Sequence, residues 1–377
     1  MALMRFKTEL ILLSLFFLPI RGEISANEKL SEATPVITVA AVGDIMMGTD
    51  YPLPKLPKKD GGLLFGESKG FLRKADIVLG NLEGPLCEEG SPEKKAKEGE
   101  SYLFRTPPRY VKNLVDAGFN VVSLANNHAG DFGDKGMSST KKVLQAAGIK
   151  YSSKAGEVAE FEINGLRIGL VALSFGPPPR SIVYPEKALE EIDLLSKKYD
   201  LLILSIHGGK EGETALRTEN EFEYFLDEPR GNLIQFAHEA IERGADLILA
   251  HGPHVPRAVE IYQDRLIAYS LGNFCTFRGM SLDKEKGYAP LLWVELGSHG
   301  EFVRGRIVSF IQFPPGGPKR DGEERAWALI KKLSQEDFPK TSPFFGLSET
   351  LLPKEKTPEK DVLPSIPSIR DSSDEIR

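Results

Sequence analysis

The sequence is organised around one stretch, which reads Val121-Val122-Ser123-Leu124-Ala125-Asn126-Asn127-His128-Ala129-Gly130-Asp131-Phe132-Gly133. Its apolar first half has the pattern of a buried parallel strand, which is a continuous apolar run. Its second half is polar, and ligands of α/β sheets bind beyond the carboxyl ends of such strands. The stretch therefore offers Asn127 as an oxygen ligand, His128 as a proton-transfer group and Asp131 as the carboxylate that orients the histidine. The alternative is a polar loop with a structural histidine.

Length and composition are those of a globular protein with one large domain or two small ones. The chain has 377 residues, of which 41% are hydrophobic and 27% are charged, enough for a sizeable core. Its net charge is -6, and its basic residues are interspersed with acidic ones. A nucleic-acid-binding protein would carry a concentrated basic surface, so this pattern argues against nucleic acid as a partner.

The N-terminus has the layout of a secretory signal peptide, which we assign to residues 1–26. Basic residues precede an almost wholly apolar run from Leu10 to Ile20, and small and polar residues follow it. That run is too short for a comfortable membrane span. Cleavage near Gly22 or Ala26 would leave a secreted or periplasmic mature chain without a transmembrane segment. An uncleaved segment that keeps the protein associated with the membrane is the alternative.

The C-terminal part differs in composition from the rest of the chain. We expect a folded domain over residues 36–313, followed at 314–377 by a largely disordered tail that is rich in proline and charge. One short helix is predicted within that tail, from Glu323 to Gln335, around several apolar residues.

The chain has two cysteines, Cys87 and Cys275. In an exported protein they could form one disulfide bond. Each follows a motif that we place at the site, so the two could be close in space.

Apolar strand-like runs alternate with predicted helices, which is typical of an α/β fold. Strands are predicted at 36–42, 77–79, 121–124, 201–205 and 247–250, and helices at 108–117, 138–147, 188–198 and 232–243. Several strands end in a residue that can bind a metal or transfer a proton: Asp44, Glu83, Asn127 with His128, His207, and His251 with His254. These include four of the six histidines, whereas His238 in a helix and His299 in a hairpin turn do not suggest a site.

Histidine, carboxylate and amide ligands together suit a divalent ion such as manganese, zinc or iron, with one or two ions in the site. The predicted metal ligands are Asp44, Glu83, Asn127, His207, His251 and His254. Such an ion polarises a phosphoryl or carbonyl oxygen and lowers the pKa of bound water. His128, with Asp131 close behind it, is the natural group to protonate a leaving oxygen. His251 and His254 reach one centre only if Gly252-Pro253 forms a tight turn, which these residues favour.

Eight motifs follow one another between about residues 37 and 277. They are Gly43-Asp44-Ile45-Met46, Gly80-Asn81-Leu82-Glu83, Ala125-Asn126-Asn127-His128, Asp131-Phe132-Gly133, His207-Gly208-Gly209-Lys210-Glu211, Gly244-Ala245-Asp246, His251-Gly252-Pro253-His254-Val255 and Tyr269-Ser270-Leu271-Gly272-Asn273-Phe274. In this order they resemble the CapA family of poly-γ-glutamate capsule proteins, a branch of the calcineurin-like metallophosphoesterase superfamily. Each motif alone is weak, but eight in register are a strong signal. The resemblance implies two packed mixed β-sheets flanked by helices, a four-layer sandwich, and a dinuclear metal site.

The resemblance also implies roles for individual residues. The matched positions are Asp44 for the first aspartate ligand, Asn127 for the asparagine ligand, His128 for the catalytic histidine, and His207 and His254 for later histidine ligands, with His251 as neighbour. Two positions depart from the family pattern, because Met46 stands where a histidine ligand is usual and Asn81 where an aspartate bridges two ions. Glu83 could substitute for that bridge, and Glu211 could be a further ligand or base. The residues expected to contact substrate are Asn81, Asn126, Ser270 and Asn273.

Three functions fit these observations. The leading one is an exported metal-dependent hydrolase that acts on an envelope or capsule polymer, through a phosphoester or a γ-glutamyl amide, with His128, Asp131 and Glu211 as catalytic residues. The second is a non-catalytic partner of a capsule synthase or export complex, whose site binds the carboxylates of an anionic polymer. The third is a structural domain of the cell envelope.

Overall fold

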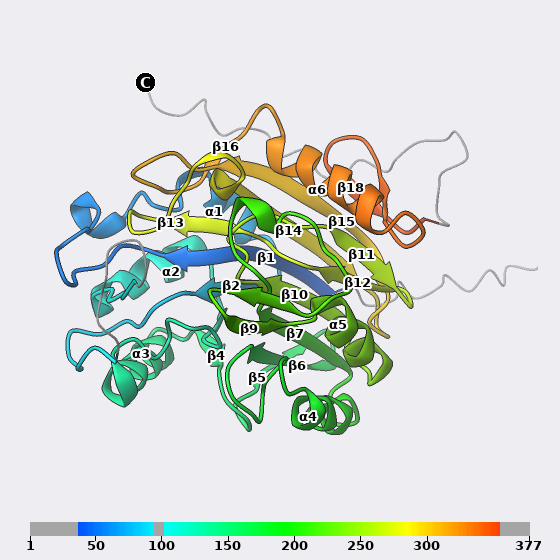
Figure 1. Ribbon diagram of the computed structural model, residues 1–377, viewed down its shortest axis with the longest axis horizontal. Helices are drawn as coiled ribbons and strands as arrows, with labels where there is room; N and C mark the ends of the chain where they lie inside the picture. Colours follow the sequence, from blue (N-terminus) through cyan, green and yellow to red (C-terminus); the bar gives the residue numbers. More distant parts are fainter. Residues whose placement is uncertain (1–36, 94–101, 355–377) are drawn as a thin grey trace, which may run out of the picture. The chain divides into compact units, whose positions relative to one another are not determined.

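The computed structural model describes residues 37–93 and 102–354 (Figure 1). The predicted signal peptide and the chain beyond residue 354 lie outside the described residues. The described residues form two mixed β-sheets, a two-stranded hairpin and six α-helices. The predicted α/β fold of two mixed sheets flanked by helices is confirmed.

The larger sheet has the strand order β17-β18-β15-β14-β1-β2-β3-β4, with β13 beside β1 and β16 beside β15. Its strands are β1 (Ile37–Met46), β2 (Ile77–Leu82), β3 (Val121–Ser123), β4 (Lys150–Ser152), β13 (Asn273–Thr276), β14 (Tyr288–Leu296), β15 (Phe302–Ile311), β16 (Lys319–Arg320), β17 (Phe344–Phe345) and β18 (Thr350–Leu352). The smaller sheet, in the order β11-β12-β10-β7-β6-β5, contains β5 (Ala159–Ile163), β6 (Leu166–Ser174), β7 (Leu201–His207), β10 (Leu247–His251), β11 (Val259–Tyr262) and β12 (Arg265–Ala268). The separate hairpin pairs β8 (Glu223–Phe225) with β9 (Glu228–Gly231).

Both sheets are covered on both faces, which explains their continuous apolar sequences. Side chains alternate across a strand, so Val39 and Ala41 of β1 pack against the second sheet, whereas Ala40 and Val42 pack against helices. The helices on the larger sheet are α1 (Lys69–Leu72), α2 (Val111–Ala117) and α3 (Gly133–Ala146), and those on the smaller sheet are α4 (Glu186–Ser196) and α5 (Leu233–Glu242) (Figure 1). This arrangement gives four layers, with one apolar core between the sheets and one beneath each helical layer.

Parallel pairing brings the functional ends of the strands together. In the larger sheet β1 is parallel to β2 and to β13, and β2 is parallel to β3. In the smaller sheet β6, β7, β10 and β12 are parallel neighbours. The carboxyl ends of these strands therefore meet at one edge of each sheet, where ligands of α/β proteins bind.

The domain extends further along the chain than the predicted boundary at residue 313. The predicted helix is present as α6 (Arg325–Asp337), and Trp327 and Ile330 of α6 pack into the core between the sheets. Three short strands that were not predicted flank this helix in the sequence, with β16 before it and β17 and β18 after it. Of these, β18 pairs with β15 and with β17. Residues 314–354 thus belong to the folded domain, because their few apolar side chains complete its core.

The disulfide bond that the two cysteines could form is absent, which corrects that expectation. Both cysteines are free and buried. Cys87 packs against Leu103 and Phe132, whereas Cys275 belongs to the core beneath the helices of the larger sheet. Burial raises the pKa of Cys87 to about 11, so its thiol stays protonated and unreactive at neutral pH.

No helix within residues 37–93 and 102–354 combines the length and the apolar character needed to cross a membrane.

Candidate metal and catalytic site

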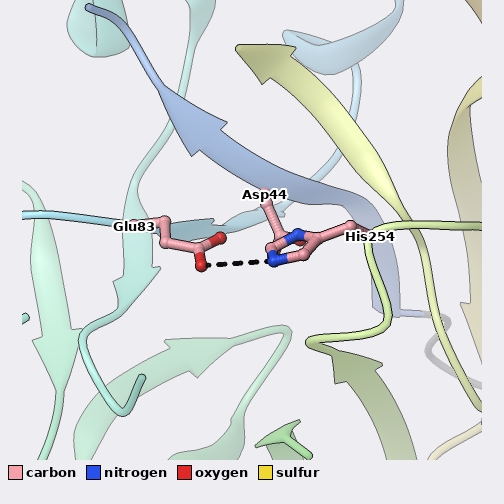
Figure 2. Close-up of side chains that lie close together, drawn as sticks. All are labelled: Asp44, Glu83 and His254. Carbon is pink, nitrogen blue, oxygen red and sulfur yellow. Dashed lines mark hydrogen bonds and ion pairs between the residues drawn. The ribbon is translucent and has the colours of Figure 1, made fainter. Parts of the chain in front are cut away.

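Three side chains from separate elements converge at the carboxyl edge of the sheets. Asp44 lies near the end of β1, Glu83 directly follows β2, and His254 follows β10. Nδ1 of His254 is 2.9 Å from Oδ2 of Asp44, and its Nε2 is 3.8 Å from Oε1 of Glu83. One ligand atom from each residue lies within 4.8 Å of the other two (Figure 2). Two carboxylates and an imidazole at this spacing can hold one divalent ion.

Local backbone geometry places these side chains. Gly43 precedes Asp44, and a Cβ on Gly43 would lie 1.9 Å from the carbonyl oxygen of Gly272, so only glycine fits there. The register of β1 with its parallel neighbours β2 and β13 also shifts next to Asp44. Such a shift changes the direction of the Asp44 side chain. His254 has φ +59°, a left-handed conformation that is costly for a non-glycine residue and is concentrated at functional sites.

A second group of ligand atoms lies buried beside the first. Oδ1 of Asn127, Nε2 of His207 and both ring nitrogens of His251 have no hydrogen-bond partner among the described residues. The same is true of both carboxylate oxygens of Glu83. Buried polar atoms are rarely left without a partner, and each exception needs an explanation such as a bound ion. These residues therefore fit a divalent metal, and their number allows a second ion.

Charge in the site favours a cation. Burial opposes the charged form of His254, but Glu83, Asp44 and Glu211 outweigh it and raise the pKa of His254 to about 10. Burial, together with the charge of Asp44, raises the pKa of Glu83 well above its ordinary value. The carboxylates thus repel one another and hold a positive charge between them, which a divalent ion would also supply.

His207 and His251 are kept in the neutral form, which is the form that binds a metal. Burial lowers the pKa of His207 well below its ordinary value and lowers the pKa of His251 to about 4. Both imidazoles are therefore neutral at pH 7, and a neutral imidazole is the form that coordinates a metal.

His128 and Asp131 form the pair that the sequence suggested. Nδ1 of His128 lies 2.9 Å from Oδ2 of Asp131, and the same oxygen accepts a hydrogen bond from the backbone N–H of Phe104 at 2.8 Å. The Phe104 ring packs on the imidazole, with centroids 4.3 Å apart. The carboxylate and the aromatic ring together fix the orientation of the histidine.

A cavity of about 590 Å³ opens on the site. Its lining includes five of the predicted site residues, namely Asn127, His128, Glu211, His254 and Asn273. The cavity lining does not include the other predicted residues among those described, Asp44, Asn81, Glu83, Asn126, Asp131, His207, His251 and Ser270. The first five are therefore the predicted residues that a substrate could touch.

Three residues predicted to contact substrate make hydrogen bonds within the protein and do not line the cavity. Asn81 is fully buried, and its Nδ2 donates to Asp44 at 2.8 Å and lies 3.3 Å from Nδ1 of His207. Asn126 donates to Asn81 at 3.0 Å, and its own oxygen accepts from the backbone N–H groups at the start of the next turn. Ser270 donates to the carbonyl of Val255 at 2.7 Å, which braces the loop that carries His254.

The two departures from the family pattern have clear structural outcomes. Met46 is buried in the core, and its sulfur accepts from the backbone N–H of Gly48 at 3.2 Å, so it is not placed as a ligand. Asn81 donates to Asp44, so its amide does not supply the negative charge of a bridging aspartate. The lining also contains residues that were not predicted, notably Arg230, Phe225 and Lys286, which lie in segments without a strong local pattern.

These features define an α/β protein with a buried group of carboxylate and histidine side chains beside an open cavity. A family model described as "Bacterial capsule synthesis protein PGA_cap" matches residues 38–277. The chain therefore belongs to the PGA_cap family, as the motifs predicted.

Curated relatives include the capsule biosynthesis protein CapA of Bacillus anthracis, which is 28% identical over 78% of this chain and 70% of its own. The PGA biosynthesis protein CapA of Bacillus subtilis (strain 168) is 27% identical over 80% of this chain and 78% of its own.

Similar solved structures include a 5'-nucleotidase precursor from Thermus thermophilus, at 13% identity over 80% of this chain and 59% of its own, with a TM-score of 0.41. The purple acid phosphatase PPD1 from yellow lupin is 11% identical over 77% of this chain and 55% of its own, with a TM-score of 0.36. This chain thus spans less than two thirds of the length of either structure.

Proposed function

We propose that the protein is an exported, metal-dependent hydrolase that acts on an envelope or capsule polymer during its assembly. The observation that carries the proposal is that the oriented acid–base group His128 and the metal-ligand candidate His254 line the same cavity. Membership of the PGA_cap family supports a capsule polymer as the setting. Poly-γ-glutamate, which would be cut at a γ-glutamyl amide, and a phosphoester are the two substrate classes that this chemistry can serve.

Most of these residues would bind metal, and one would transfer a proton. Asp44, Glu83 and His254 would hold one divalent ion, of manganese, zinc or iron, and Asn127, His207 and His251 would hold a second. A bound ion supplies polarisation of the scissile phosphoryl or carbonyl group and a lowered pKa of water. His128, fixed through Nδ1 by Asp131, would give its proton to the leaving oxygen or nitrogen.

A chelator tests the metal dependence. Purified protein should hydrolyse at least one member of a panel containing poly-γ-glutamate and a generic phosphodiester. That turnover should fall to background after treatment with a chelator and return when manganese, zinc or iron is added back. Turnover that survives complete removal of metal, checked by elemental analysis, would contradict the proposal.

A second candidate function is a non-catalytic partner of a capsule synthase or export complex. Met46 and Asn81, which replace a histidine ligand and a bridging aspartate, favour it, because they leave fewer ligands for two catalytic ions. In this role the site would bind the carboxylates of the anionic polymer. Binding of poly-γ-glutamate by calorimetry, together with no turnover across the panel, would select this function over hydrolysis.

Export is part of the proposal and rests on the sequence of the first 26 residues. Mass spectrometry of the mature protein should show that about 22–26 N-terminal residues are missing, as the signal-peptide pattern predicts. An intact Met1 on protein recovered from the cytoplasm would rule export out.

A further inference from the structure

Glu211 connects a buried arginine to the candidate metal group. Its Oε1 is 2.8 Å from Nη1 of Arg230, and its Oε2 is 3.8 Å from Nε2 of His254. An oxygen of Glu83 lies at the same distance, 3.8 Å, from that His254 nitrogen. Two carboxylates therefore approach one imidazole nitrogen, and Glu211 is the one that lines the cavity.

Arg230, on β9, is held rigidly. Its side chain is 4% exposed, and its guanidinium lies over the ring of Phe175 at 4.1 Å and that of Phe225 at 5.3 Å. Its Nε and Nη1 make no hydrogen bond within the described residues, so the short contact with Glu211 is an ion pair without an aligned N–H. A buried donor that makes no hydrogen bond is costly.

The same arginine reaches the second half of the site. The ring of Phe175, on which the guanidinium stacks, lies 5.9 Å from the imidazole of His207. Arg230 thus pairs directly with Glu211 and is linked to His207 through the ring of Phe175. A group that pairs directly with a metal ligand orients the ligand and tunes its affinity, and Arg230 is such a group for Glu211.

We propose that Glu211 is an additional ligand of an ion held by Asp44, Glu83 and His254, and that Arg230 is the positioning residue that holds Glu211 for it. The inference rests on the metal site of the proposed function and adds its fourth protein ligand. Three ligands leave a divalent ion with open positions, and a carboxylate oxygen suits manganese, zinc and iron. A guanidinium that stacks on aromatic rings keeps its position, so it gives the Glu211 carboxylate a fixed partner that a flexible lysine ammonium would not give.

Calorimetric titration of the chelator-stripped full chain with Mn²⁺ tests both roles. We expect Glu211→Gln and Arg230→Gln each to weaken Mn²⁺ binding by about 10- to 100-fold, the usual effect of losing a ligand or its supporting partner. Arg230→Lys should recover only part of the loss. In the Glu211→Gln background, adding Arg230→Gln should cause little further loss, because the arginine acts through the glutamate.

The chain offers a matched control for the loss of a buried ion pair. Arg180 and Glu191 are 2.7 Å apart with side chains 4% and 20% exposed, close to the 4% and 18% of Arg230 and Glu211. Neither residue of the control pair lines the cavity. Glu191→Gln should therefore lower the melting temperature of the metal-free protein while leaving Mn²⁺ affinity unchanged.

Several results would overturn the inference. They are Mn²⁺ affinity in Glu211→Gln within twofold of wild type, an equal effect of Arg230→Gln in both backgrounds, and a wild-type protein that binds no divalent ion. The Mn²⁺ titration can succeed even if the proposed function fails. If the variants show this pattern of Mn²⁺ affinities but the wild type has no turnover, hydrolysis is refuted and the assignment of Glu211 as a ligand stands.

Discussion

Replacing His128 with alanine should lower turnover by about 10²- to 10⁴-fold, the usual contribution of a general acid–base group. Metal content and fold should stay intact, because the ligand atoms belong to other residues and the backbone turn is held by Asn126. Asp131 and Phe104 fix the orientation of the imidazole, so the variant removes a group that is already in position for proton transfer. Turnover and metal content of the same preparation are the measurements.

His238 provides the matched control for that experiment. It too pairs with a carboxylate at 2.9 Å, Glu260, but it lies on α5 and does not line the cavity. His238→Ala should leave turnover within a few-fold of wild type. Normal capsule in cells that carry His128→Ala, combined with no turnover of the purified wild type on any substrate, would remove the catalytic function and leave the partner function.

The alternation of strands and helices could be predicted because its signal is local. Continuous apolar runs such as those that became β1, β7 and β10 predict strands covered on both faces, and polar residues at their ends predict a site. Asp44 and His207 were found in this way, since each ends its own run. The resemblance of the motifs to a known family then added the arrangement in two packed mixed sheets.

Contacts between distant segments could not be predicted from local pattern. Asp44 and His254 are 210 residues apart, and their 2.9 Å contact depends on parallel pairing and on the φ of +59° at His254. Arg230 lies on a four-residue strand with no periodic pattern, so its place behind Glu211 is purely tertiary. The strands β16 to β18 have two or three residues each, too few for any alternation to show.

The segment from Ile267 to Phe274 shows where a local pattern misleads. Its apolar run at 267–271, followed by Gly272-Asn273-Phe274, has the pattern of one strand with a polar end. In the structure the chain leaves the smaller sheet at Ala268 and enters the larger one at Asn273. Asn273 therefore pairs with Asp44 and lines the cavity, while Ser270 braces the crossing. Because the change from one sheet to the other takes only five residues, the hydrophobicity pattern of the sequence does not show it.

Removing His207 and His254 together should abolish metal binding and with it the thermal stabilisation that metal provides. The two residues come from β7 and from the turn after β10, one in each ligand group, so the double variant deprives both groups of a nitrogen. A ligand that binds only the folded state at a concentration 100 times its Kd stabilises that state by about 2.7 kcal/mol. For a domain of this size we expect metal to raise the melting temperature of the wild type by roughly 5 °C and that of the variant hardly at all.

Comparing each protein with and without metal separates ion binding from packing. The double variant also loses the 2.9 Å contact between His254 and Asp44 and leaves a cavity at the buried His207, so its metal-free form should already melt lower than wild type. The control is His238→Ala with His299→Ala, the two histidines outside the site, which should keep the metal-dependent rise in full. Equal metal content in wild type and the His207→Ala, His254→Ala variant would refute the site, because these two imidazoles would then have no part in holding the ion.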